Sequence, residues 1–295
     1  MKVRVGVGTG TQVSSGDELG GIVDDLETLG FDSLWLSDIL TLPGDDPLTG
    51  MAFAAGRVRR LKVGTTMVLP GRNPVRLAKQ LATVDRLSGG RLLLTFVIGL
   101  RLPSELEAMG VRAEDRGSTV DDTLPLLRRL WSEDVVDHDD GAWSLRGVTV
   151  EPKPVQQPLD VWLGGNTPSA LRRVGALADG WLPALCTPEQ AGDGRRVVEE
   201  AAAVAGRAID PEHFGVSIGY AYGDVPAPLA ARISARARGA QLTDVVPNGI
   251  AALRELLLRF IDVGFSKFVV RPLATPTSWR RELEELARGV LDLQK

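Results

Sequence analysis

Cysteine and histidine are scarce in this chain of 295 residues. It contains one cysteine, Cys186, and two histidines, His138 and His213. A single cysteine excludes an internal disulfide and any metal site built from several thiolates, and it predicts a reducing, cytoplasmic setting. His138 stands in a charged turn and His213 just before the seventh predicted strand, and we expect both at the surface, so a Ser–His–Asp triad has no suitable histidine.

Long apolar runs and an excess of basic charge are also missing. No run approaches the ~20 apolar residues of a membrane-spanning helix, and the first residues enter a predicted strand without a signal-peptide pattern. The 34 basic and 38 acidic residues give a formal net charge of −4. Without a basic patch we expect no nucleic-acid partner. The composition therefore predicts a globular protein that acts on neither membranes nor nucleic acid.

Residues for metal or Schiff-base chemistry are poorly placed. The acidic turn at Asp137, Asp139 and Asp140 lacks further ligands nearby, so we interpret it as a solvated turn and expect no metal site. A Schiff-base lysine would stand at the carboxyl end of a barrel strand, whereas Lys62 and Lys267 fall near predicted strand starts. An aldolase-type reaction is therefore disfavoured.

Short β-rich runs alternate with amphipathic stretches along the whole chain, which predicts parallel strands joined by helices. The predicted strands are 3–8, 33–37, 62–68, 91–97, 160–163, 180–183, 214–219 and 267–271. The predicted helices are 17–29, 47–57, 74–87, 116–131, 168–178, 188–205, 249–263 and 279–293. Eight of each, in strict alternation, predicts a (β/α)₈ barrel, an α/β fold.

No repeat or low-complexity linker divides the chain, so we predict a single domain over 1–295. Three connections are long, at about 100–115, 132–158 and 220–248. The first and third follow the fourth and seventh strands, on the face where such barrels place their active sites. The second follows a helix and belongs to the opposite face, and its segment 143–150 is typical of a small hairpin.

The turn after the fifth strand predicts an anion site. Gly164 and Gly165 end the strand, Thr167 has the character of an N-cap and Pro168 that of a first helical residue. Unpaired N–H groups and the helix dipole would attract a phosphate, and the glycines would let it approach. The alternative is a tight strand-to-helix turn with no ligand.

The other predicted strand ends carry few ionisable groups. Gly6, Gly8 and Gly10 have the wrong spacing for a dinucleotide fingerprint, because no helix follows them directly. Arg271 could bind a phosphate or the acidic tail of a cofactor, or form a salt bridge in the barrel mouth. A site so short of acid–base groups favours a redox cofactor, which supplies the chemistry itself.

Several segments, in order and spacing, carry a family resemblance. They are 29–38, 63–68, 73–74, 78–85, 87–91, 107–111, 115–117, 161–166 and 178–181. With them the chain resembles the luciferase-like flavin and deazaflavin oxidoreductases, which are (β/α)₈ barrels. The arginine- and alanine-rich composition is most similar to the branch that uses coenzyme F420, an 8-hydroxy-5-deazaflavin; FMN is the alternative. The resemblance also implies a homodimer acting on a small-molecule substrate.

The resemblance implies roles for individual residues. It places a strand bulge, often with a non-prolyl cis peptide, at Thr66–Met67 behind the flavin ring, and it makes Asp38 a candidate catalytic carboxylate, whose alternative is a loop cap. The residues implied in cofactor binding are Thr66, Met67, Ile98, Gly99, Gly164, Gly165, Asn166 and Thr167.

Some positions depart from relatives. Ile39 and Leu100 stand where sugar-phosphate dehydrogenases of the family have a histidine and an acid, and Thr95 and Val97 stand where relatives often have glycines. An apolar substrate pocket is expected, with walls at Ile39, Leu40, Leu69, Leu100 and Leu102. We therefore predict direct hydride transfer to an activated C=C or C=N, with a proton from solvent or Asp38.

Three alternatives stay open. One is an FMN-dependent monooxygenase on the same fold, and another is a flavin- or deazaflavin-binding protein without turnover. The third, a lyase or isomerase barrel that binds phosphate, needs ionisable strand ends that the sequence does not provide.

Overall fold

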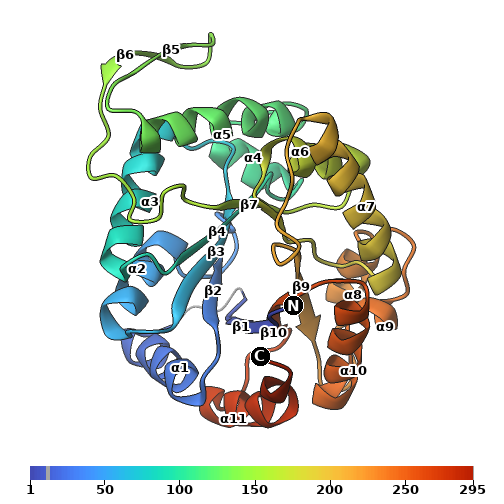
Figure 1. The fold of residues 1–295 in the computed structure, drawn as a ribbon. Coiled ribbons are helices and arrows are strands. Elements are labelled where there is room, and N and C mark those ends of the chain that lie inside the picture. The colour runs from blue at the N-terminus through green and yellow to red at the C-terminus, as the bar shows by residue number, and fades with distance from the viewer. Residues whose placement is uncertain (11–13, 295) are drawn as a thin grey trace.

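The computed structural model describes residues 1–10 and 14–294, and in this part of the chain eight parallel strands form one sheet (Figure 1). Its order is β8-β7-β4-β3-β2-β1-β10-β9, and bridges from Trp181 to Phe214 and from Ala184 to Ser217 join the two edge strands into a barrel. The strands are β1 (Arg4–Gly8), β2 (Ser33–Ser37), β3 (Lys62–Val68), β4 (Leu92–Val97), β7 (Val161–Leu163), β8 (Gly180–Trp181), β9 (Gly215–Tyr220) and β10 (Lys267–Pro272). The predicted (β/α)₈ fold is confirmed.

Helices surround this barrel, and each predicted helix is present with ends that differ by a few residues at most. They are α1 (Gly16–Leu29), α2 (Pro47–Arg57), α3 (Pro74–Ser88), α5 (Arg116–Ser132), α6 (Pro168–Leu177), α7 (Pro188–Val204), α10 (Gly249–Asp262) and α11 (Trp279–Val290), the last followed by the 3₁₀ turn Leu291–Leu293. No helix in the described residues is both long and apolar enough to span a membrane.

Successive side chains of each strand point alternately out of and into the barrel, and they build two apolar layers. Side chains such as Val5, Val63 and Met67 are fully buried in the main core, which lies between the strands and the helices. Inward-facing side chains form a smaller cluster in the barrel, where Trp35, Leu182 and Val269 pack with Leu93 and Trp162. Glycines in the neighbouring strands make room for the two large indoles. A Cβ on Gly64 would lie 2.7 Å from the Trp35 ring, and one on Gly180 would lie 2.3 Å from the Trp162 ring.

The three long connections carry structure of their own. The first contains α4 (Pro103–Met109), and the third contains α8 (Ala227–Ser234) and α9 (Leu242–Val245), which enclose a small separate core around Ile233 and Val246. The second forms a hairpin from β5 (Val136–Asp139) and β6 (Ser144–Val148), which projects beyond the ring of helices (Figure 1). It begins earlier than the expected segment 143–150, which supplies only its second strand.

The histidines correct one expectation. His138 is partly buried in the β5–β6 hairpin, with its side chain 19% exposed, and pairs with Asp140 at 2.9 Å. His213, expected at the surface, is partly buried at the amino-terminal end of the barrel, where its ring packs on Trp162 with centroids 5.4 Å apart. Its position before β9 turns the ring inward. Among the residues that the structure describes, no group of three or more His, Cys, Asp or Glu side chains is placed to hold a metal ion.

Candidate functional site

The residues predicted to bind a cofactor lie on one rim of the barrel. Asp38 follows β2, Thr66 and Met67 lie near the end of β3, Ile98 and Gly99 follow β4, and the 164–167 turn joins β7 to α6. Because all eight strands are parallel, their carboxyl ends meet on the same face. Folding therefore brings together segments that are more than a hundred residues apart in sequence.

The turn after β7 has the geometry of an anion site. Thr167 caps α6 by accepting a hydrogen bond from the Ala170 N–H at 3.3 Å, and Pro168 is the first helical residue. Gly165 has φ +101°, a conformation that favours glycine. The N–H groups of Gly165, Asn166 and Ser169 donate to no acceptor in the described part of the chain. These free donors at a helix start would suit a phosphate or another anion.

Packing and hydrogen bonds hold this turn in place against the neighbouring strands. Gly164 donates to the Phe96 carbonyl at 2.9 Å, and a Cβ at its position would lie 2.7 Å from Val97. The Trp181 indole donates to the Gly165 carbonyl at 2.8 Å. The turn is thus held against β4 and β8 and presents its N–H groups outward.

An arginine from the long third connection contacts this turn. The Arg238 guanidinium donates to the Asn166 carbonyl, and the backbone of Arg238 accepts a hydrogen bond from the Gln190 side chain at 3.2 Å. The segment after α8 therefore lies over the turn. Sequence reasoning missed Arg238, because its partner is 72 residues away.

Asp38 is held by an ion pair. Its carboxylate accepts hydrogen bonds from Arg72 at 2.6 Å and from the Val68 N–H at 3.0 Å, and its side chain is 9% exposed. Arg72 also donates to the Val68 carbonyl at 2.9 Å. This arrangement ties the end of β2 to the end of β3, which is the role that the loop-cap alternative describes.

Thr66 and Met67 face opposite sides of β3. Thr66 is partly exposed, whereas the Met67 side chain is fully buried in the outer core and faces the helices. The strand pairs regularly with β2 and β4 throughout. The peptide bond between the two residues is trans, and the cis bonds in the described chain precede Pro152 and Pro158. The bulged cis peptide expected from the resemblance is therefore absent here.

Ile98 and Gly99 are fixed by a buried arginine. Arg116, at the start of α5, donates to the Gly99 carbonyl at 2.9 Å and to the Ile98 carbonyl at 3.4 Å. Gly99 has φ +77°, and a Cβ there would approach Val68 to 3.0 Å. Burial and the nearby charge of Arg101 lower the pKa of Arg116.

Arg271 brings an unpaired positive charge to the barrel mouth. It ends β10 beside β1, where a Cβ on Gly8 would lie 3.4 Å from its Cβ and one on Gly10 would lie 3.9 Å from Nη1. Within residues 1–10 and 14–294, its guanidinium has no hydrogen-bond or ion-pair partner. Burial and the charge of Arg236 lower the pKa of Arg271. The salt bridge considered from sequence is not formed, so this cation is available to an anion.

The expected apolar walls are only partly present at the rim. Leu69 is fully buried in the outer core, so its assignment to the pocket is wrong; it follows the outward-facing Met67 by two residues and points the same way. Leu40 is 59% exposed. Ile39, Leu100 and Leu102 are partly exposed beside the ends of β2 and β4.

Comparisons with known proteins agree on one family and fold. The family model described as "Luciferase-like monooxygenase" matches residues 1–256. The sulfoquinovose monooxygenase of Agrobacterium fabrum (strain C58) is 32% identical over 210 residues, 70% of this chain and 53% of that protein. An F420-dependent glucose-6-phosphate dehydrogenase of Amycolatopsis mediterranei (strain U-32) is 29% identical over 168 residues, 53% of this chain and 50% of that enzyme.

The fold matches over the whole chain. A solved structure of an F420-dependent secondary alcohol dehydrogenase with an F420–acetone adduct superposes with a TM-score of 0.83, at 17% identity and with both chains fully covered. By contrast, the sequence matches span about half the length of the two curated relatives.

Proposed function

Because the chain belongs to the luciferase-like monooxygenase family, we propose that it is an oxidoreductase that uses reduced coenzyme F420 to reduce a small organic substrate. The observation that carries this proposal is the turn from Gly164 to Thr167, with free N–H groups at the start of α6 on the carboxyl-terminal rim. Relatives include F420-dependent and monooxygenase proteins, and FMN is the alternative cofactor.

The residues present fit the anionic part of such a cofactor. Gly165, Asn166 and Ser169 would donate backbone hydrogen bonds to a phosphate, and Thr167 would keep the first turn of α6 in place. Ile98 and Gly99, held by Arg116, and the backbone of Thr66 and Met67 would line the ring. When bound, a reduced deazaflavin supplies a hydride, and the protein orients the two reactants and excludes water.

The residues that we assign to the rim, within the described part of the chain, include no carboxylate that is free of an ion pair. Asp38 is paired with Arg72, so we propose that solvent supplies the proton when hydride adds to an activated C=C or C=N bond. Ile39, Leu100 and Leu102 would contact the apolar part of the substrate. Arg271 offers a second point for a negative charge, on the cofactor or on the substrate.

A fluorescence titration tests the cofactor. Purified protein is titrated with F420 and, separately, with FMN. Thr167→Ala removes the cap of α6, and we expect a loss of about fivefold in affinity, because a cap is worth about 1 kcal/mol. Thr187→Ala is the matched control, since Thr187 caps the next helix, α7, by the same bond to Gln190. We expect this variant to bind like the wild type. Equal losses in both variants, or binding of neither cofactor, would overturn the proposal.

A monooxygenase that uses reduced FMN is the second candidate, and the family description favours it. If the protein prefers FMN and consumes oxygen in step with substrate, the monooxygenase reaction is favoured over reduction of the substrate by F420. A protein that binds cofactor without turnover would bind F420 stoichiometrically and leave the reduced form unoxidised across a panel of enones and imines.

A further inference from the structure

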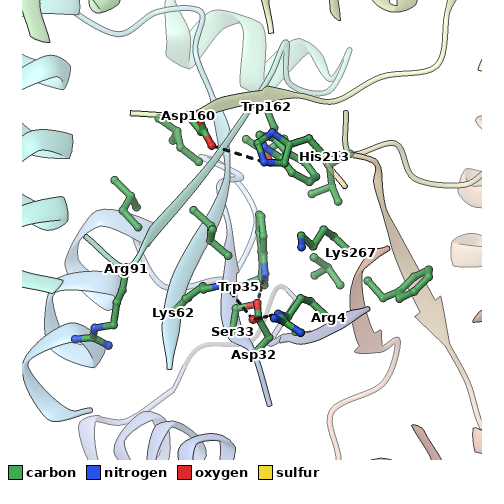
Figure 2. A pocket seen from close by; sticks show the side chains of 18 of the residues that line it. Arg4, Asp32, Ser33, Trp35, Lys62, Arg91, Asp160, Trp162, His213 and Lys267 are labelled. Atoms are coloured by element: carbon green, nitrogen blue, oxygen red, sulfur yellow. Dashed lines mark hydrogen bonds and ion pairs between the residues drawn. The ribbon is translucent and has the colours of Figure 1, made fainter. Parts of the chain in front are cut away.

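A second cavity lies at the opposite end of the barrel from the proposed cofactor rim. Its volume is about 250 Å³, and its lining includes the first residues of β1, β2, β3 and β10. Figure 2 shows the side chains of Arg4, Lys62 and Lys267 around it, together with Asp160 and His213 on another side. Barrel enzymes carry out their chemistry at the other face, so the proposed reaction does not account for this cavity.

Lys267 is a cation without a partner in this cavity. It begins β10, is partly buried, and its ammonium forms no hydrogen bond or ion pair within the described ranges 1–10 and 14–294. Figure 2 shows its ammonium end directed toward the space beside Trp35. A partly buried positive charge that no hydrogen-bond acceptor contacts directly is costly, so an anion beside this ammonium would be stabilising.

The nearest carboxylate is already shared. Asp32 pairs with Lys62 at 3.1 Å and with Arg4 at 3.3 Å. Burial lowers the pKa of Lys267, and so do the charges of Lys62 and Arg4, whereas the carboxylates of Asp32 and Glu212 act in the opposite direction. Arg91 also lines the cavity, but its guanidinium donates to the carbonyls of Ala55, Val58 and Leu61 and is directed away from the space. This wall therefore has more cations than carboxylates.

The inner wall of the cavity is flat and apolar. Trp35 and Trp162 both line it, together with Leu93, Leu182 and Val269, and the five side chains form one cluster. The Trp35 indole is fixed in orientation by a 2.9 Å hydrogen bond from its N–H to the Ser33 hydroxyl. Thr95 lines the same wall, and its buried hydroxyl has no partner in the described part of the chain. Indole surfaces of this kind favour an aromatic ring.

Polar groups stand on the remaining side. Nδ1 of His213 donates to the Asp179 carbonyl at 2.9 Å, which leaves Nε2 facing Asp160 at 3.9 Å. Burial raises the pKa of Asp160. A hydroxyl group on a ligand could bond to either side chain, because both have free hydrogen-bonding capacity there.

We propose that this cavity binds a small aromatic carboxylate, whose carboxylate pairs with the Lys267 ammonium and whose ring packs against Trp35 and Trp162. The volume of about 250 Å³ suits a single substituted ring. The ligand binds without reacting, and its binding does not depend on the proposed cofactor.

Calorimetric titration of the full chain with benzoate and with benzamide tests the charge requirement. The two probes share a ring and a similar size, but only benzoate is an anion. We expect benzoate to bind at least about tenfold more tightly than benzamide, because the charged hydrogen bond to Lys267 is lost with the amide. We expect 4-hydroxybenzoate to bind more tightly than benzoate through Asp160 or His213. Equal binding of benzoate and benzamide, or no binding of either, would overturn the proposal.

Variants locate the site. Lys267→Met should weaken benzoate binding about tenfold or more, whereas Lys79→Met, a matched change on the exposed face of α3, should leave it unchanged. F420 titration of Lys267→Met should match the wild type, which separates this proposal from the cofactor proposal and checks the fold. Retention of full benzoate affinity in Lys267→Met would refute the site. If that variant does not fold, Trp162→Leu replaces it, and unchanged benzoate affinity there would refute the site equally.

Discussion

The Arg72 guanidinium lies 2.6 Å from the Asp38 carboxylate and joins the ends of two neighbouring strands, β2 and β3. The pair is mostly shielded from water, with side-chain exposures of 26% for Arg72 and 9% for Asp38. It occupies the rim where a cofactor ring is proposed. Its integrity should therefore matter for stability and for the shape of the site.

Removing the arginine tests the structural part of this relationship. Arg72→Met should lower the free energy of unfolding by about 3 kcal/mol, because it leaves a buried carboxylate without its charge partner. Urea unfolding measures the change. Arg76→Met, at an exposed position in the first turn of α3, should change stability by less than about 0.5 kcal/mol. Equal effects of the two changes would contradict the importance of the pair.

Replacing the carboxylate tests the chemical part. Asp38→Asn keeps the shape of the side chain and an oxygen that can accept from Val68, but it cannot act as an acid. If solvent supplies the proton, kcat with an enone substrate should stay within about threefold of the wild type. Removal of a general acid usually costs about 100-fold or more. A loss of that size, with cofactor affinity unchanged, would assign the proton to Asp38.

Gly64 tests the packing inside the barrel. A Cβ at this position would lie 2.7 Å from two atoms of the Trp35 indole. The ring also packs closely over β1, where a Cβ added to Gly6 would lie 2.9 Å from it, so it has little room to move. Gly64→Ala should therefore destabilise the fold by about 2 kcal/mol, as overpacked core positions do. Gly21→Ala provides the contrast, since a Cβ there meets nothing within 4 Å and the position is helical. Chemical denaturation should show that variant to be more stable by about 0.5 kcal/mol.

Lys267 predicts a pH dependence of stability. Its pKa in the folded protein is lowered from 10.5, chiefly by burial. The unfolded chain therefore holds this proton more tightly, and the charged side chain opposes folding below the folded pKa. That cost disappears as the pH rises through the folded pKa toward 10.5.

Lys267→Met should accordingly unfold at a higher urea concentration than the wild type near neutral pH, and the difference should shrink as the pH approaches 10.5. Lys79→Met controls for the general effect of losing one lysine. A difference that is the same at both pH values would show that the charge of Lys267 is not the cause.

Local features of the sequence were sufficient for the eight strands and eight helices of the barrel, although they did not predict α4, α8 and α9 in the long connections. The cap at Thr167 and Pro168 after it act within one turn of chain, so sequence reasoning located them. Eight alternating strand and helix patterns then predicted the barrel and the rim on which Asp38, Gly99 and Gly164 lie.

Only the tertiary structure decided which charges are paired. The partners of Asp38 and Asn166 are 34 and 72 residues away, and neither pairing leaves a local signal. Within the described part of the chain, Lys267 and Arg271 have no ion-pair partner. The sequence does not reveal this either, because it depends on which side chains the closed barrel brings near each cation. Backbone hydrogen bonds and caps depend on nearby residues, whereas the neighbours of an inward-facing side chain are set by strand register and by closure of the sheet.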